Sequence, residues 1–177
     1  MENKKLTLKE KRLSYVTVLE PRSIVQDGPL YYSVSIIIPK NDPQVNEIKK
    51  AITEIVNDQK WSPIEKKKAD LALRDGDEER PDDAAYKDSY YLNAKSAKKP
   101  RVVGRYKEEI TDPDKIYSGC YGNVLISLYP FDKGGNKGVG VGLRGVQFVK
   151  DGEPLSSVVT DDEFEDFEVE GIDESLF

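Results

Sequence analysis

Aromatic, glycine and basic residues share one face of two consecutive stretches near the end of the chain. Between residues 119 and 132, alternate positions are small or aliphatic, and the positions between them include Tyr121, Asn123, Ser127, Tyr129 and Phe131. Residues 137–149 repeat this split, with one face made of Gly138, Gly140, Gly142 and Arg144. Glycines leave the backbone open to close approach, and bases stack on aromatic rings for about 1–3 kcal/mol each. This face therefore has the residue types needed to bind a single nucleic-acid strand with little sequence preference.

The alternation and the surrounding charges select the individual candidates. We expect four aromatic residues to stack on bases: Tyr91, Tyr121, Tyr129 and Phe131. We expect five cations to contact phosphates: Lys95, Arg101, Arg105, Lys137 and Arg144. For any one of these residues the alternative is an ordinary strand tyrosine or a solvated charge. The hypothesis depends on the whole set occurring together.

The charge of the chain is divided unevenly. Residues 1–150 hold all 27 Lys and Arg and 22 of the 33 Asp and Glu, a net charge of +5, and residues 151–177 hold the other 11 acids. The last 18 residues, TDDEFEDFEVEGIDESLF, combine nine of these acids with Phe164, Phe167 and Phe177. A flexible tail of this length reaches roughly 23 Å, against a body radius of gyration near ~15 Å. Because acids spaced by phenylalanines resemble phosphates spaced by bases, we expect Phe164 and Phe167 to compete for the basic face. A merely solvating tail is the alternative.

Several chemistries are excluded or disfavoured. The chain has no histidine, and Cys120 is its only cysteine, so disulfides, Cys/His zinc sites and imidazole catalysis are excluded. The glycine repeat at 138–142 is not followed by a helix, which a phosphate-binding glycine loop requires. The acidic run at 75–79 is followed by Arg80 where a calcium loop needs glycine. We therefore predict no cofactor and no enzymatic activity.

Two other readings stay open at this point. One is a metal-dependent nuclease, for which the carboxylates would be Asp82, Asp83, Asp112 and Asp114. The other is a protein-interaction module or an acidic DNA mimic whose body binds no nucleic acid. RNA as the ligand, the site size and a homodimer also stay open. The N-terminus has no apolar signal core and no run of about 18 apolar residues occurs, so we expect a soluble cytoplasmic protein that does not enter a membrane.

The predicted elements are mostly strands. Alternating Tyr, Val and Ile predict strands at 13–19, 30–40, 89–96 and 100–106, and a hairpin formed by 119–132 and 137–149. One main helix begins at Asp42-Pro43, followed by apolar residues at helical spacing, and a capping box at Ser62–Glu65 opens a short second helix. Residues 74–88 have no apolar period and predict an exposed loop. We expect Trp61 to lie in the core.

These elements predict one domain followed by a tail. The absence of regular βα alternation favours a mostly β fold, an antiparallel barrel of five to six strands with one main α-helix. The domain would span residues 1–153, with a charged N-terminal arm at 1–12. Residues 154–177 would form a flexible, disordered acidic tail.

Four stretches resemble the bacteriophage-type single-stranded DNA-binding proteins. They are YSVSIIIPKND (32–42), LRDGDEE (73–79), YYLNAKS (90–96) and YSGCYGNVLISLYPFDKGGNKGVGVGLRGVQFVKDGE (117–153). The resemblance implies an OB-fold barrel that coats and protects single-stranded DNA during phage replication, recombination and repair in the host cytoplasm. It also implies a C-terminal tail that recruits replication proteins, through Asp173, Glu174, Leu176 and Phe177. The main helix departs from the commonest OB order because it follows the second strand.

Overall fold

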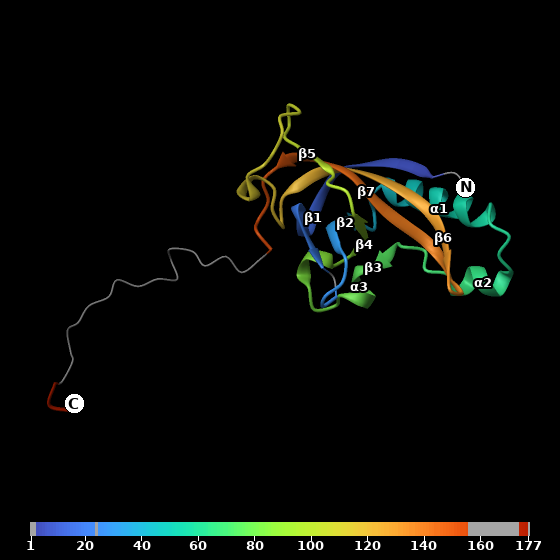
Figure 1. The fold of residues 1–177 in the computed structure, drawn as a ribbon, viewed down its shortest axis with the longest axis horizontal. Helices are drawn as coiled ribbons and strands as arrows, with labels where there is room; N and C mark the ends of the chain where they lie inside the picture. The colour runs from blue at the N-terminus through green and yellow to red at the C-terminus, as the bar shows by residue number, and fades with distance from the viewer. Residues whose placement is uncertain (1–2, 24, 156–173, 177) are drawn as a thin grey trace.

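Five strands close into a barrel in the computed structural model, which describes residues 3–23, 25–155 and 174–176. β1 (Lys4–Ser23) pairs with β2 (Leu30–Pro39) and with β6 (Tyr121–Lys133), β2 pairs with β4 (Ser89–Ser96), and β6 pairs with β7 (Asn136–Lys150). A parallel pairing of β4 with β7, at Lys95 and Gly142, closes the ring (Figure 1). The predicted OB-type barrel is confirmed.

Two short strands and several helices complete the body. β3 (Arg74–Asp75) pairs with β4, and β5 (Arg101–Val103) pairs with β7. The helices are α1 (Gln44–Asn57), α2 (Pro63–Lys68), α3 (Gly76–Glu79) and the 3-10 turns η1 (Ala84–Tyr86), η2 (Pro113–Lys115) and η4 (Glu174–Leu176). In chain order, α1 follows β2 and precedes β4, as the sequence predicted. The capping box of α2 is present, with Ser62 N–H donating to Glu65 Oε1 at 2.9 Å.

The barrel interior follows the period of two that the sequence shows. Cys120 and the β6 residues Gly122, Val124, Ile126 and Leu128 are all buried, and Val139, Val141 and Leu143 of β7 face them. α1 packs its apolar face against β1, β2, β6 and β7, and Trp61 lies partly buried against the same core. The predicted interior face and the core position of Trp61 are confirmed.

A buried lysine fixes the start of α1 to β1. Lys11 Nζ lies 2.9 Å from Asp42 Oδ2, 2.8 Å from Gln44 Oε1 and 2.7 Å from the carbonyl oxygen of Lys9, so its three protons have acceptors. Asp42 also accepts a hydrogen bond from Gln44 N–H at 2.8 Å, the capping role that its position predicted. Burial raises the pKa of Asp42, but the Gln44 N–H and the Lys11 ammonium lower it more, so the carboxylate stays charged.

The expected N-terminal arm is part of the barrel. From Lys4 onward the charged segment forms the first half of β1, and Leu6 and Leu8 pair with Ile126 and Val124 of β6. The pairing register shifts between Leu8 and Lys11, where Glu10 has a left-handed φ of 51°. This bulge breaks the alternation, which hides the strand in the sequence.

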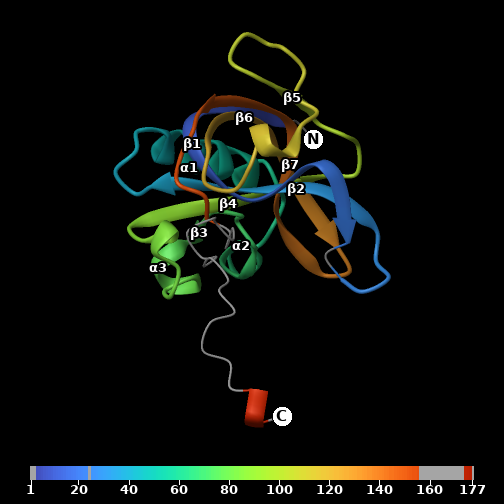
Figure 2. The same ribbon diagram turned by 90° about the vertical axis from the view of Figure 1, so that its left-hand side faces the viewer.

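The segment expected as an exposed loop, residues 74–88, covers part of the barrel instead. β3 and α3 lie beside β4 (Figure 2). The Tyr86 side chain is completely buried, and its hydroxyl donates to Ser35 Oγ at 2.9 Å. Ile37, Tyr86 and Tyr91 form a second, small hydrophobic cluster on the outer face of the barrel.

Candidate nucleic-acid interface

Two aromatic rings of β6 lie across glycines of β7. Tyr129 is the register partner of Gly140, and Phe131 is the partner of Gly138. A Cβ placed on either glycine would lie less than 3.0 Å from atoms of the facing ring. The rings therefore occupy the space that side chains of β7 would otherwise fill. We call Tyr129, Phe131, Gly138 and Gly140 the glycine platform; it presents two half-buried rings on the outer face.

The glycine platform forms one wall of a groove of about 450 Å³ between β4 and β7. Asn93 and Lys95 of β4 lie opposite Tyr129 and Phe131, and Lys133 stands at the end of β6. The remaining lining residues are Asp70, Ala72, Arg74, Val139, Gly140 and Val141. The structure thus brings the predicted residues Tyr129, Phe131 and Lys95 together in one site, the β4–β7 groove.

The cations of the β4–β7 groove differ in what they contact. Arg74 is paired with Asp70 at 3.0 Å and with Glu79 at 3.2 Å. Lys95 and Lys133 are exposed and form no ion pair with any described residue. The Lys95 ammonium lies 4.8 Å from the centre of the Tyr31 ring. Lys95 and Lys133 are therefore the groove cations that are free to bind an external anion.

A second hollow lies further along β6 and β7, beside β5, and is lined by Arg101 and Arg144. This hollow of about 400 Å³, the β5–β7 pocket, has Leu125 and Val146 among its lining residues, and its third cation is Lys107. Leu125 pairs with Gly145 whereas Ile126 pairs with Leu143, so Arg144 is the additional residue of a β-bulge. Arg144 is exposed as a result. Arg105 is also exposed, on the loop that follows β5.

A row of register partners connects the groove with the β5–β7 pocket. Lys5 pairs with Ser127, Ser127 with Gly142, and Gly142 with Lys95. Ser127 and Gly142 are small, and the two exposed lysines flank them. Tyr129 and Leu125 are four residues apart on β6, about 13 Å. The outer face of β6 and β7 thus offers one continuous path lined by rings and free cations.

Lys137, the fifth predicted phosphate contact, lies elsewhere and is already paired. Its Nζ is 2.8 Å from Glu65 Oε2 and 3.5 Å from Asp132 Oδ2, and its side chain is 18% exposed. The hydrogen bond with Glu65 raises the pKa of Lys137 and lowers the pKa of Glu65 to about 2. Lys137 holds α2 against the β6–β7 hairpin, and this geometry gives no support to a phosphate contact.

Two of the predicted stacking residues are separate from the groove. Tyr91 is only 4% exposed and packs edge-on against Tyr86, with ring centres 5.0 Å apart. Tyr121 lies at the opposite end of β6 from Tyr129, and the Lys150 ammonium is 4.8 Å from its ring centre. Tyr91 has no free ring face for a base, so we omit it from the site.

Most of the tail residues predicted to compete with DNA or to bind partners lie outside the described residues. Phe164, Phe167, Asp173 and Phe177 lie outside the described residues, whereas Glu174 and Leu176 belong to η4, where Leu176 is 77% exposed. The chain is held on the body as far as Leu155, the second residue of the predicted tail. Arg12 Nη2 donates to the carbonyl of Glu153 at 2.7 Å, and Leu155 N–H donates to the carbonyl of Ser118 at 3.0 Å. The competition and recruitment hypotheses stay predictions.

Two residues of this surface, Lys133 and Tyr31, were not predicted from the sequence. Tyr31 shares the outward face of β2 with Ser33 and Ser35, and that alternation alone could have placed it beside Lys95. Lys133 directly precedes the turn of the hairpin, where strand alternation carries no information.

Two of the four carboxylates considered for metal binding, Asp83 and Asp112, have structural roles. Asp83 caps η1 by accepting from Ala85 N–H, and Asp112 caps η2 by accepting from Asp114 N–H. Among residues 3–23, 25–155 and 174–176, no three or more metal-ligating side chains are grouped. No helix in that part of the chain is long and apolar enough to span a membrane.

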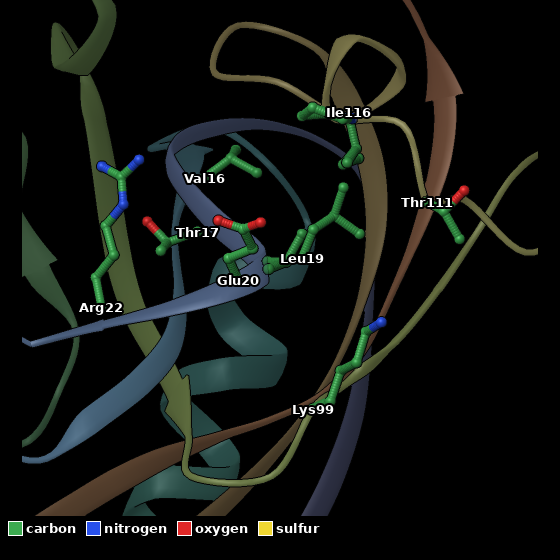
Figure 3. A pocket seen from close by; sticks show the side chains of 10 residues that line it. Val16, Thr17, Leu19, Glu20, Arg22, Lys99, Thr111 and Ile116 are labelled. Atoms are coloured by element: carbon green, nitrogen blue, oxygen red, sulfur yellow. The ribbon is translucent and has the colours of Figure 1, made fainter.

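A third hollow, of about 400 Å³, lies away from the aromatic rings. β1 lines it from Val16 to Arg22, and Lys99, Thr111, Pro113 and Ile116 face β1 across it. Figure 3 shows Glu20 at its centre with Arg22 and Lys99 to either side. An acidic group there and the lack of a ring make it unsuited to a nucleic-acid strand.

Comparisons with known proteins find similar proteins from bacteriophages. The family model for the single-stranded DNA-binding protein of Enterobacter phage Enc34 matches residues 4–176. A putative protein p50 of Acyrthosiphon pisum secondary endosymbiont phage 1 is 33% identical over 185 residues, covering 97% of this chain and 98% of its own. The fold is similar to that of the Enc34 single-stranded DNA-binding protein in complex with single-stranded DNA, with a TM-score of 0.73, 23% identity, and coverage of 86% of this chain and 89% of that chain. It is also similar to gp2.5, the single-stranded DNA-binding protein of bacteriophage T7, with a TM-score of 0.65, 16% identity, and coverage of 97% and 98%.

Proposed function

Because the chain belongs to the family of the Enc34 phage single-stranded DNA-binding protein, we propose that it binds single-stranded DNA with little sequence preference. Bases stack on Tyr129 and Phe131 of the glycine platform. Phosphates follow Lys95 and Lys133, and then the arginines of the β5–β7 pocket. Coating a strand in this way would protect it during phage DNA replication, recombination and repair in the host cytoplasm.

One observation supports this proposal most strongly. Two half-buried rings replace the side chains of a glycine strand, and two unpaired lysines flank the same groove. Stacking platforms bordered by positive charge are what binding of single strands without base readout requires, because every base has a π-face and every nucleotide a phosphate.

Quenching of Trp61 and tyrosine fluorescence by oligo-dT, compared with duplex DNA at matched salt, tests the function. We expect oligo-dT to bind more tightly than the duplex, and Tyr129→Ala to weaken binding about 5- to 150-fold without a change in melting temperature. Wild-type affinity in Tyr129→Ala would remove that residue from the site. Absence of any binding to oligo-dT, even after removal of the tail, would favour a protein-interaction module.

We further propose that the acidic tail competes with DNA for the basic face and recruits replication proteins. Residues 1–150 carry a net charge of +5 and residues 151–177 hold 11 acids, so the body and the tail attract one another when no DNA is bound. Ending the chain after Thr160 should raise the affinity for oligo-dT and steepen its salt dependence. More Lys and Arg side chains would then be free to neutralise phosphates, and each contact releases counterions from the DNA. Identical isotherms across salt concentrations would refute the competition. Asp173, Glu174, Leu176 and Phe177 would form the partner contact, tested by deleting residues 173–177 and measuring capture of phage replication proteins.

A further inference from the structure

An unusual cluster of aromatic rings surrounds a single arginine at the far end of the face that carries the groove. The Arg80 guanidinium carbon lies 4.8 Å from the ring centre of Tyr15, 4.9 Å from that of Tyr86 and 4.9 Å from that of Tyr91. These rings come from β1, η1 and β4, and Arg80 directly follows α3. We call these four residues the Tyr15–Arg80 cluster.

The charge of Arg80 has no counter-ion among the described residues. None of the ion pairs in the described part of the chain includes Arg80, and its Nε is buried without a hydrogen-bond partner. Burial lowers the pKa of the guanidinium, but the Tyr91 hydroxyl and the phenol oxygens of Tyr86 and Tyr15 raise it more. Aromatic faces stabilise the charge but accept no conventional hydrogen bond. Within the described residues, the buried Nε of Arg80 is left without an acceptor.

Tyr15 is the exposed member of the cluster. Its side chain is 58% exposed, whereas Tyr86 and Tyr91 are buried. Its φ is 47°, the left-handed region, where β1 loses register between Ser14 and Thr17. A bulky residue is uncommon in this conformation, and such strain gathers at functional sites. The bulge displays a ring in solvent next to a cation that lacks acceptors.

The cluster adjoins the β4–β7 groove. Ser14, Ser35 and Asn93 are register partners across β1, β2 and β4. Asn93 lines the groove, and Tyr86 of the cluster covers Ser35. A strand that leaves the glycine platform past Lys95 and Asn93 would reach the Tyr15–Arg80 cluster next.

The charges around Arg80 indicate which part of a nucleotide suits it. The segment that carries Arg80 also holds five carboxylates, Asp77, Glu78, Glu79, Asp82 and Asp83. They would repel a phosphate, or a carboxylate of the tail, but not a neutral base. Among the groups of a base, the acceptors for a guanidinium include carbonyl oxygens such as those of thymine and guanine.

We propose that the Tyr15–Arg80 cluster is a nucleobase subsite at one end of the bound strand. The base stacks on Tyr15, and its carbonyl oxygens accept hydrogen bonds from Arg80. The subsite deepens the proposed function and rests on it.

Oligo-dT in which one base at a time is removed tests the subsite. With the wild-type chain, each abasic position that normally stacks should lower affinity. In Tyr15→Asn, where asparagine tolerates the left-handed φ, affinity should fall roughly tenfold, and one terminal position should become insensitive to base removal. Tyr106→Asn is the matched control: Tyr106 is 86% exposed but lies in the loop after β5, and its abasic profile should equal the wild type. An unchanged profile in Tyr15→Asn would overturn the proposal.

The Arg80→Lys variant separates base recognition from a purely structural role. Lysine keeps the charge but loses the planar donors, so the preference for thymine over adenine at the terminal position should fall severalfold while Tyr15 stacking persists. A lower melting temperature with the base preference intact would show that Arg80 only holds the α3 segment on the barrel, and would overturn its assignment. If the wild-type chain bound no oligonucleotide at all, the proposed function itself would fail.

Discussion

The outer face of β2 and β4 has a covered half and an open half. In the covered half, Ser35, Ile37 and Tyr91 are buried beneath Tyr86, whereas in the open half Ser33 is half-buried and Asn93 and Lys95 are exposed. Both halves belong to the same two strands and have similar alternation. The difference comes from residues 76–86, which include Arg80 and cover one half. A segment outside the two strands therefore determines which of their side chains can bind a ligand.

The largest expected effect is on stability, when the covered half is exposed. Tyr86→Ala should lower the free energy of unfolding by about 3–5 kcal/mol, because it removes a fully buried ring and leaves a cavity above Ser35. Tyr86→Phe should cost only about 1 kcal/mol, since it removes the hydrogen bond alone. Urea unfolding measures both. If Tyr86→Ala were as stable as the wild type, the cover would not stabilise the fold.

In the open half, a single methyl group should disturb binding rather than folding. Gly140→Ala places a Cβ where the Tyr129 ring lies, so the ring must move and affinity for oligo-dT should fall about tenfold. In a Tyr129→Ala background the same substitution should have little further effect, because there is no ring to displace. Additive losses in the double variant would show that Gly140 acts independently of Tyr129.

Replacing the unpaired Lys95 and replacing the paired Lys137 should change the salt dependence of DNA binding differently. Lys95 is unpaired, so Lys95→Ala should reduce the slope of log K against log salt by about 0.7, the value for one phosphate contact on a single strand. Lys137→Ala removes the same charge from a lysine that Glu65 and Asp132 already neutralise, and its slope should equal that of the wild type. Equal reductions in both variants would mean that overall charge, and not position, sets the binding.

The smallest expected effect concerns the corner held by Lys137. The pKa of Glu65 is lowered from 4.5 to about 2 by its hydrogen bond with Lys137, so the contact stabilises the folded state fully above pH 4.5. It is lost as the pH falls through about 2. An NMR titration of the Glu65 carboxyl should show the low pKa, and Lys137→Met should return it towards 4.5. A wild-type pKa near 4.5 would contradict the contact.

Local alternation made much of the barrel predictable. The interior residues of β6 and β7 repeat every second position and are buried: Gly122, Val124, Ile126, Leu128, Val139, Val141 and Leu143. Tyr129, Phe131 and their glycine partners followed from the same alternation, because a hairpin fixes which residues face each other. The start of α1 at Asp42-Pro43 was equally local.

The errors concern features that the alternation within a single strand does not show. Tyr91 looked like an exposed ring because nothing in residues 74–88 announces that Tyr86 will cover it. Lys137 looked free because its partner, Glu65, is far away in sequence. The first half of β1 was missed because a bulge at Glu10 shifts the phase of its alternation.

The closure of the barrel has a further consequence for a protein that is proposed to bind at high density along single-stranded DNA. Copies at high local concentration risk joining edge to edge through unpaired backbone groups, the route to aggregation. Here the five long strands are paired on both sides, and the strands at the ends of the sheet, β3 and β5, have only 2 and 3 residues. Within the described residues, the architecture thus offers neighbouring copies almost no backbone edge, so dense packing need not lead to fusion of their sheets.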